Sequence, residues 1–126
     1  MAQLGTDQKQ SDKVVKWLTD ERYIDDARFA AAYARGKFRS NSWGKIAITD
    51  GLRQKGIDKA MIERALKEIP DAEYTQIVDK LIARKWDETA GDDTNVRERK
   101  IYAYMASKGF EGDLIWSAIK RREYTK

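Results

Sequence analysis

The chain has 126 residues and a formal net charge of +4, and it lacks both cysteine and histidine. These absences exclude disulfide scaffolds, thiolate metal sites and thiol catalysis, and they remove the commonest metal ligand and general base. Charged residues make up 37% of the sequence, and no apolar run approaches the roughly 20 residues of a membrane helix. We therefore expect a cytoplasmic protein that is not an enzyme, contacts no membrane, and has no cofactor, metal site or small-molecule substrate.

A single proline and many Ala, Lys, Arg, Glu and Ile residues favour an all-α fold. The first segment, residues 1–21, is similar to the end of a three-helix repeat found further along the chain. Its apolar residues Val14, Val15 and Leu18 have the spacing of Met61, Ile62 and Ala65. We expect residues 1–21 to be the last helix of a first repeat whose other helices are missing.

Residues 22–70 are expected to form a complete three-helix repeat. Asp25 is a candidate N-cap for a helix that ends near Phe38. The spacing i, i+3, i+4, i+7 predicts that this helix buries a stripe of apolar or small residues. The stripe comprises Phe29, Ala32, Tyr33 and Gly36.

Ser40-Asn41-Ser42 is expected to break this helix, and a second helix is expected from about Gly44 to Lys55. Gly56 is placed to end the second helix in a left-handed conformation. Asp58 is a candidate N-cap for a third helix, and the flanking pair Ile57 and Ile62 has the spacing of a hydrophobic staple. Pro70 stops this third helix.

Residues 71–126 repeat this pattern. A shift of 53 residues pairs Gly56 with Gly109 and Ile62 with Ile115, whereas a shift of 48 pairs Phe38 with Trp86. The difference places five extra residues in the acidic, turn-like stretch 87–95. Because such repeats close their cores by stacking, we predict an elongated array of tandem three-helix repeats, a right-handed or curved helical stack.

Basic residues provide the main candidate binding groups. Between Arg28 and Lys55 the only acidic residue is Asp50. Such a stretch would attract a phosphate backbone or an acidic protein face, although a solvated helix face is the plain alternative. The candidates are Arg28, Arg35, Lys37, Arg39, Lys45, Arg53 and Lys55 in one set, and Arg84, Lys85, Arg97, Arg99, Lys100 and Lys108 in the other. Stacked repeats could bring the two sets onto one surface.

The four tryptophans fall into two groups. Trp17, Trp86 and Trp116 lie in helical apolar patterns and are expected in the core, whereas Trp43 lies in a loop beside Lys45 and is a candidate for base stacking. The carboxylate pair Asp25–Asp26 is expected to cap a helix rather than to catalyse a reaction.

These features resemble the RecX family, the bacterial modulators of RecA recombinase. The resemblance rests on Tyr23-Ile24-Asp25-Asp26-Ala27-Arg28-Phe29-Ala30, on Leu52-Arg53-Gln54-Lys55-Gly56-Ile57 and on Arg99-Lys100-Ile101-Tyr102, and it covers about residues 11–122. Two positions depart from the family pattern: Ala47 stands where a basic residue is usual, and Gly51 where Glu is frequent.

The resemblance implies three tandem three-helix repeats and a non-enzymatic role. Family members bind RecA filaments on single-stranded DNA and suppress ATP hydrolysis and strand exchange, which links them to DNA repair, homologous recombination and the SOS response. The implied partner is therefore a RecA filament, with possible direct contact to DNA. The alternative is a free-standing helical nucleic-acid-binding module that has no recombinase partner.

Overall fold

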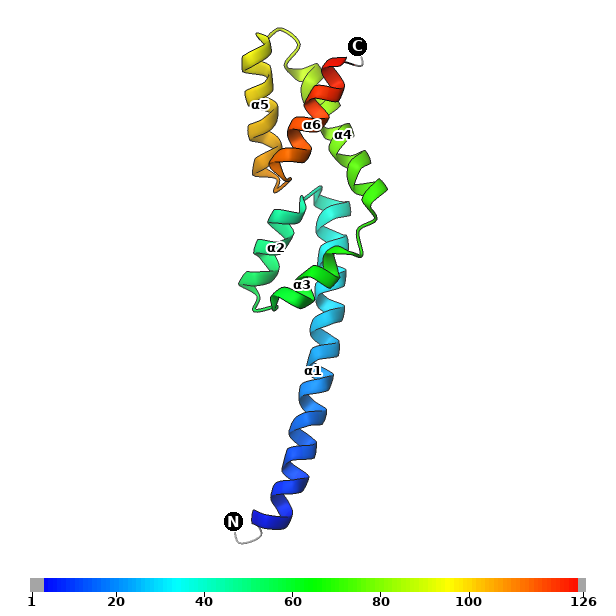
Figure 1. Ribbon diagram of the computed structural model, residues 1–126, viewed down its shortest axis with the longest axis vertical. Helices are drawn as coiled ribbons and strands as arrows, with labels where there is room; N and C mark the ends of the chain where they lie inside the picture. The colour runs from blue at the N-terminus through cyan, green and yellow to red at the C-terminus, as the bar shows by residue number, and fades with distance from the viewer. Residues whose placement is uncertain (1–3, 125–126) are drawn as a thin grey trace.

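The computed structural model describes residues 4–124, and the side chains of residues 16–18 and 20–124. These residues form an all-α structure, with no strand in the described part of the chain (Figure 1). The helices are α1 (Leu4–Asn41), α2 (Lys45–Gln54), α3 (Lys59–Leu66), α4 (Asp71–Glu88), α5 (Thr94–Ser107) and α6 (Gly112–Tyr124). The predicted fold class is confirmed.

The helices form two stacked units of three. The C-terminal part of α1 packs with α2 and α3, while α4, α5 and α6 pack on one another, which gives an elongated molecule (Figure 1). The N-terminal part of α1 extends away from both units. Below, repeat two denotes the unit of α1, α2 and α3, and repeat three denotes the unit of α4, α5 and α6.

Burial follows the two sequence shifts. Ile48 and Ile101, which are separated by 53 residues, are both buried, and so are Phe38 and Trp86, which are separated by 48. The turns also match. Gly56 and Gly109 have φ values of 81° and 91°, the left-handed conformation that glycine tolerates at the end of a helix.

The predicted cap of the third helix is confirmed. Asp58 accepts a hydrogen bond from the backbone N–H of Met61 at 2.8 Å, which satisfies one of the amides that the first turn of α3 leaves unpaired. Ile57 and Ile62, the expected staple pair, are both buried. Pro70 is the N-cap of α4, so the chain turns there into the next repeat.

The expected helix start at Asp25 is wrong. Helix α1 runs without interruption from Leu4 to Asn41, so Asp25 lies in its interior and caps nothing. Between Gly5 and Gly36 the sequence contains neither glycine nor proline, and an aspartate inside a helix costs well under about 1 kcal/mol. Nothing local therefore stops the helix between the expected first repeat and repeat two.

The expected buried stripe of this helix is also wrong. The residues that α1 buries are Ala30, Ala34 and Phe38, spaced by four, whereas Phe29 is 44% exposed. Ala32 and Gly36 are exposed as well. The small alanine side chains let α2 and α3 approach the α1 backbone closely. The face of α1 that allows this close packing is therefore buried, in preference to the face with the larger Phe29.

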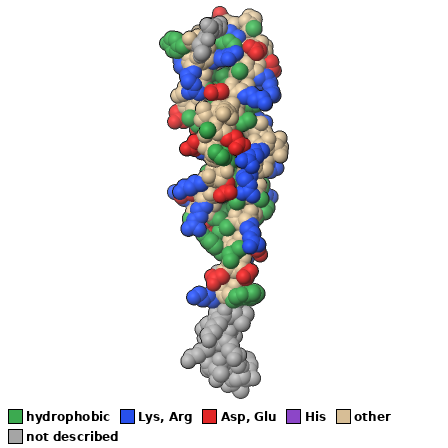
Figure 2. Space-filling view, turned by 90° about the vertical axis from the view of Figure 1, so that its right-hand side faces the viewer, with side chains coloured by type: hydrophobic (Ala, Val, Ile, Leu, Met, Phe, Trp, Pro, Cys, Tyr) green, Lys and Arg blue, Asp and Glu red, His purple; other side chains and the backbone are tan. Residues whose placement is uncertain are grey.

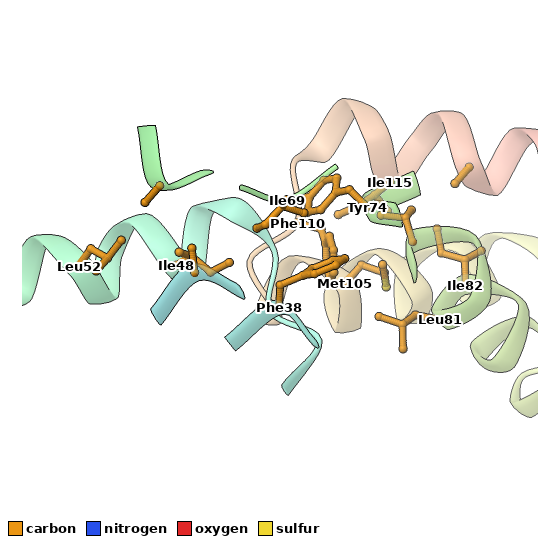
Figure 3. Close-up of a cluster of buried hydrophobic side chains, with 14 of the residues drawn as sticks. Phe38, Ile48, Leu52, Ile69, Tyr74, Leu81, Ile82, Met105, Phe110 and Ile115 are labelled. Atoms are coloured by element: carbon orange, nitrogen blue, oxygen red, sulfur yellow. The ribbon is translucent and has the colours of Figure 1, made fainter. Parts of the chain in front are cut away.

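One core joins the two repeats. The ring of Tyr74 in α4 lies 5.7 Å from the ring of Phe38 and 5.5 Å from that of Phe110, so residues from α1, α4 and the α5–α6 turn meet (Figure 3). At the same junction, the backbone N–H groups of Gly44 and Ile46 donate to the carbonyl oxygens of Lys108 and Gly109. The end of α5 thus caps the start of α2.

Candidate partner-binding surface

A lysine–aromatic cluster lies on the flank of repeat two where α1 meets α2. The ammonium of Lys37 lies 4.9 Å from the centroid of the Trp43 ring and 5.5 Å from that of Tyr33. Lys55 lies 5.9 Å from the Tyr33 centroid, and the rings of Tyr33 and Trp43 meet edge to face. These cation–π contacts hold two ammonium groups over half-buried rings.

Repeat three carries a counterpart built from different residues. Lys85, which corresponds to Lys37, lies 4.2 Å from the centroid of the Tyr104 ring. Tyr104 corresponds to Gly51, and Tyr33 corresponds to Leu81 in the same alignment of the repeats. The aromatic ring therefore comes from the first helix in one repeat and from the second helix in the other, while the lysine keeps its place.

Gly51 explains how the ring fits in repeat two. A Cβ atom on Gly51 would lie 2.2 Å from the hydroxyl oxygen of Tyr33, so the missing side chain makes room for this ring. The departure from the family pattern at this position is thus a packing feature. Sequence reasoning missed both tyrosines as part of the candidate surface, although the i, i+4 spacing of Tyr33 and Lys37 could have indicated a contact.

Two candidate arginines lie on the opposite flank of α1 from Lys37 and are engaged by carboxylates. Arg35 forms an ion pair with Glu68 at 2.9 Å. Arg39 donates two hydrogen bonds to Glu73, at 2.9 and 3.1 Å. The hydrogen bond from Arg39 lowers the pKa of Glu73, and that to Glu73 raises the pKa of Arg39. The first basic set is therefore divided between two flanks.

Three other candidates have structural partners. Arg97 lies 3.7 Å from the centroid of the Trp86 ring and donates hydrogen bonds to the Trp86 carbonyl oxygen, so it closes the end of α4. Lys108 donates to the Asn41 carbonyl oxygen at 2.7 Å across the repeat junction. Lys100 forms an ion pair with Asp92 in the acidic loop at 2.7 Å.

Lys45 belongs to the repeat junction. Its backbone N–H donates to the Tyr74 hydroxyl at 3.0 Å, and its ammonium lies 4.6 Å from the centroid of that ring. The Tyr74 hydroxyl in turn donates to Glu111. Burial, reinforced by this hydrogen bond, raises the pKa of Tyr74 well above its ordinary value.

The remaining candidates are exposed and form no ion pair with another residue of the described chain. They are Arg28, Arg53, Arg84 and Arg99. Figure 2 shows Lys and Arg side chains interspersed with Asp and Glu along the visible face. On the face that Figure 2 shows, the cations are therefore dispersed among carboxylates and form no continuous basic surface.

Two of the three tryptophans expected in the core are exposed. Trp86 is buried, but Trp17 and Trp116 are 60% and 40% exposed. Trp17 lies in the N-terminal half of α1, ahead of Ala30, Ala34 and Phe38, which this helix buries. Trp116 stacks on Tyr102 at the surface, with ring centroids 5.2 Å apart. Trp43, the candidate for base stacking, is half-buried against Tyr33.

The described residues lack two features that other functions would need, a membrane-spanning helix and a metal site. No helix among them is long and apolar enough to cross a membrane. In the same part of the chain, no cluster of His, Cys, Asp or Glu side chains could hold a metal ion.

Comparison with known proteins identifies the family. The second three-helix domain of RecX matches residues 25–66, and the third matches residues 71–119. The regulatory protein RecX of Xanthomonas axonopodis pv. citri is 34% identical over 92% of this chain and 70% of its own length. The chain belongs to the RecX family. Its two units match the second and third three-helix domains of RecX.

Solved RecX structures share this fold. The crystal structure of RecX from Lactobacillus salivarius superposes with a TM-score of 0.76 at 25% identity, covering 90% of this chain and 73% of that one. RecX of Oceanobacillus iheyensis is 31% identical over 95% of this chain but 44% of its own length. This chain thus spans less than half of some of the RecX relatives it matches.

The RecX signature at residues 23–30 forms packing contacts in this structure. The Tyr23 hydroxyl accepts a hydrogen bond from Arg64 of α3 at 2.8 Å, and Ala30 is fully buried. Ala47 stands where the family pattern usually has a basic residue. It lies at the repeat junction, where a Cβ atom on Gly109 would lie 2.3 Å from the Cβ of Ala47.

Proposed function

We propose that this RecX chain is a non-enzymatic negative modulator of RecA recombinase that acts in the cytoplasm. It binds RecA filaments on single-stranded DNA and slows ATP hydrolysis and strand exchange, which is a regulatory role in DNA repair, homologous recombination and the SOS response. The observation that carries the proposal is the match of two successive RecX domains to the two stacked units.

The lysine–aromatic flanks are the best-supported contact candidates of this proposal. Lys37 and Lys85 hold corresponding positions in the two repeats, each with its ammonium over a tyrosine ring. A regular filament presents the same chemistry at a regular spacing, so a repeated cation suits a repeated partner. The exposed Arg28, Arg53, Arg84 and Arg99 would add longer-range attraction to phosphate or to acidic protein faces.

The test is single-stranded-DNA-dependent ATP hydrolysis by RecA with this chain titrated in. We expect inhibition that weakens steeply as salt increases. The K37E/K85E variant should need about tenfold more protein for the same inhibition, because it reverses two contact charges. The matched control is K67E/K80E, which makes the same charge change at two exposed lysines, Lys67 just after α3 and Lys80 in α4.

Four outcomes separate the possibilities. Inhibition well below one chain per RecA would indicate action at filament ends, and inhibition only near saturation would indicate binding along the filament. Equal loss in K37E/K85E and the control would contradict the assignment to the lysine–aromatic flanks. DNA binding without any inhibition would contradict the proposed function and favour the free-standing nucleic-acid-binding module.

A further inference from the structure

An open groove lies between α2 and α3 of repeat two, with a volume of about 660 Å³. This volume is in the range of about 300–1,000 Å³ that is common for ligand pockets. Its floor is apolar, made by Ile57, Ile62 and Leu66, while Arg53 and Lys59 lie on its rim. The groove is separate from the lysine–aromatic flank, which lies between α1 and α2.

In repeat three an aromatic pair occupies two of the sequence positions that correspond to the groove lining. The shift of 53 residues pairs Thr49 and Glu63 of the groove with Tyr102 and Trp116. The rings of Tyr102 and Trp116 stack across α5 and α6, 5.2 Å apart with an interplanar angle of 29°. A Cβ atom on Gly112 would lie 2.7 Å from the Tyr102 hydroxyl, so this glycine makes room for the ring.

The two sites also differ in charge. Arg53 and Lys59 correspond to Ala106 and Gly112. The groove of repeat two therefore has two cations at positions where repeat three has none. Glu63 is the one acidic residue among those that line the groove. Within the described part of the chain, neither Arg53 nor Lys59 forms an ion pair.

We propose that the α2–α3 groove is a docking site for an acidic peptide segment of a partner protein, anchored by one aromatic side chain. The aromatic ring would lie on Ile57, Ile62 and Leu66, beside the positions that correspond to the stacked Tyr102 and Trp116 of repeat three. Carboxylates beside the aromatic residue would pair with Arg53 and Lys59. This inference goes beyond the proposed RecA regulation, because the groove is separate from the lysine–aromatic flanks, with only the exposed Arg53 common to both proposals, and it does not depend on which partner carries the segment.

The probe is the synthetic peptide acetyl-Asp-Asp-Trp-Asp-Asp-amide, titrated into ¹⁵N-labelled protein. We expect amide chemical-shift changes at Thr49, Gly56 and Lys59, with one peptide bound per chain. Replacing the tryptophan of the peptide by alanine should weaken binding at least about tenfold, since a buried aromatic anchor dominates such contacts. Equal binding of the two peptides would overturn the proposal, because charge alone would then explain it.

Variants that exchange the two sites provide the matched test. T49Y/K59G/E63W transfers the covering residues of repeat three into repeat two without changing the net charge, and it should abolish peptide binding. Y102T/A106R/G112K/W116E opens the corresponding place in repeat three, and it should raise the number of bound peptides from one to two. Unchanged binding in the first variant, with unchanged helical circular dichroism, would overturn the proposal.

A third variant changes only surface charges, so that a loss of peptide binding cannot be attributed to misfolding. R53E/K59E changes only two exposed side chains, so its thermal unfolding should match that of the wild type. The proposal expects this variant to lose peptide binding at low salt. Wild-type affinity in R53E/K59E would overturn the assigned rim. Failure of RecA inhibition in a separate assay would leave these peptide results unaffected.

Discussion

Gly44 donates its backbone N–H to the carbonyl oxygen of Lys108 at 2.8 Å, so α2 begins where α5 ends. A Cβ atom on Gly44 would lie 2.3 Å from the carbonyl carbon of Gly109. The close approach of the two backbones therefore needs glycine on both sides. This contact, together with the Phe38, Tyr74 and Phe110 rings, joins the two repeats.

The first prediction concerns this junction. Gly109→Ala should destabilise the protein by about 3 kcal/mol, because it adds a Cβ against Ala47 and strains a φ of 91°. Gly36→Ala is the control, since no atom lies within 4 Å of its added Cβ in helix α1, and it should stabilise by about 0.5–1 kcal/mol. Urea unfolding measures both values. Equal stability of the two variants would contradict the proposed packing of the junction.

The second prediction tests the exchange of aromatic positions between repeats. Gly51→Tyr alone should destabilise, because the space beside Gly51 is already occupied by Tyr33. The double variant Y33L/G51Y reproduces the pair Leu81 and Tyr104 of repeat three and should recover most of that loss. A double-mutant cycle measures a favourable coupling of about 1–3 kcal/mol. Additive effects would show that the two positions do not share one space.

The third prediction concerns Tyr74. Tyr74→Phe leaves the Lys45 N–H and the Glu111 carboxylate without their buried partner, so it should cost about 1–3 kcal/mol. The control is Tyr124→Phe, since Tyr124 is 89% exposed. Thermal unfolding at neutral pH measures both variants, and a Tyr74→Phe protein as stable as the wild type would contradict the role of the hydroxyl.

A fourth prediction follows from the raised pKa of Tyr74. The folded protein keeps the phenol protonated, whereas the unfolded chain loses this proton at the ordinary tyrosine pKa of about 10. The contribution to stability is thus complete below about pH 10 and is lost as the pH rises further. The wild type should therefore lose more stability than Tyr74→Phe between about pH 9 and 11, as measured by urea unfolding. Parallel pH profiles would argue against a raised pKa.

The fifth prediction separates structural from available cations. Arg97→Ala should destabilise by about 1–3 kcal/mol, because it removes the stacking on Trp86 and the hydrogen bonds to its carbonyl oxygen. Arg99→Ala, at an exposed position of the same helix, should leave stability within about 0.5 kcal/mol of the wild type. Differential scanning calorimetry distinguishes the two. Equal effects would mean that Arg97 does not stabilise the end of α4.

Short-range signals account for what the sequence predicts well. Gly56 and Asp58 mark a helix end and a helix start because each satisfies backbone groups within its own turn. The repeat shifts place Ile48, Ile101, Ile62 and Ile115 in the core for a similar reason, since apolar periodicity reports which face of a helix is buried.

The sequence by itself determined the all-α class, the repeat register and most of the helix ends, because these depend on neighbours within one or two turns. Only the tertiary structure decided which cations are engaged within the chain and which could contact a partner. Arg39, Arg97 and Lys108 bind groups that lie 34, 11 and 67 residues away in the sequence. The same holds for the buried face of α1, where Ala30 and Ala34 replace the larger Phe29, since close helix packing selects small side chains.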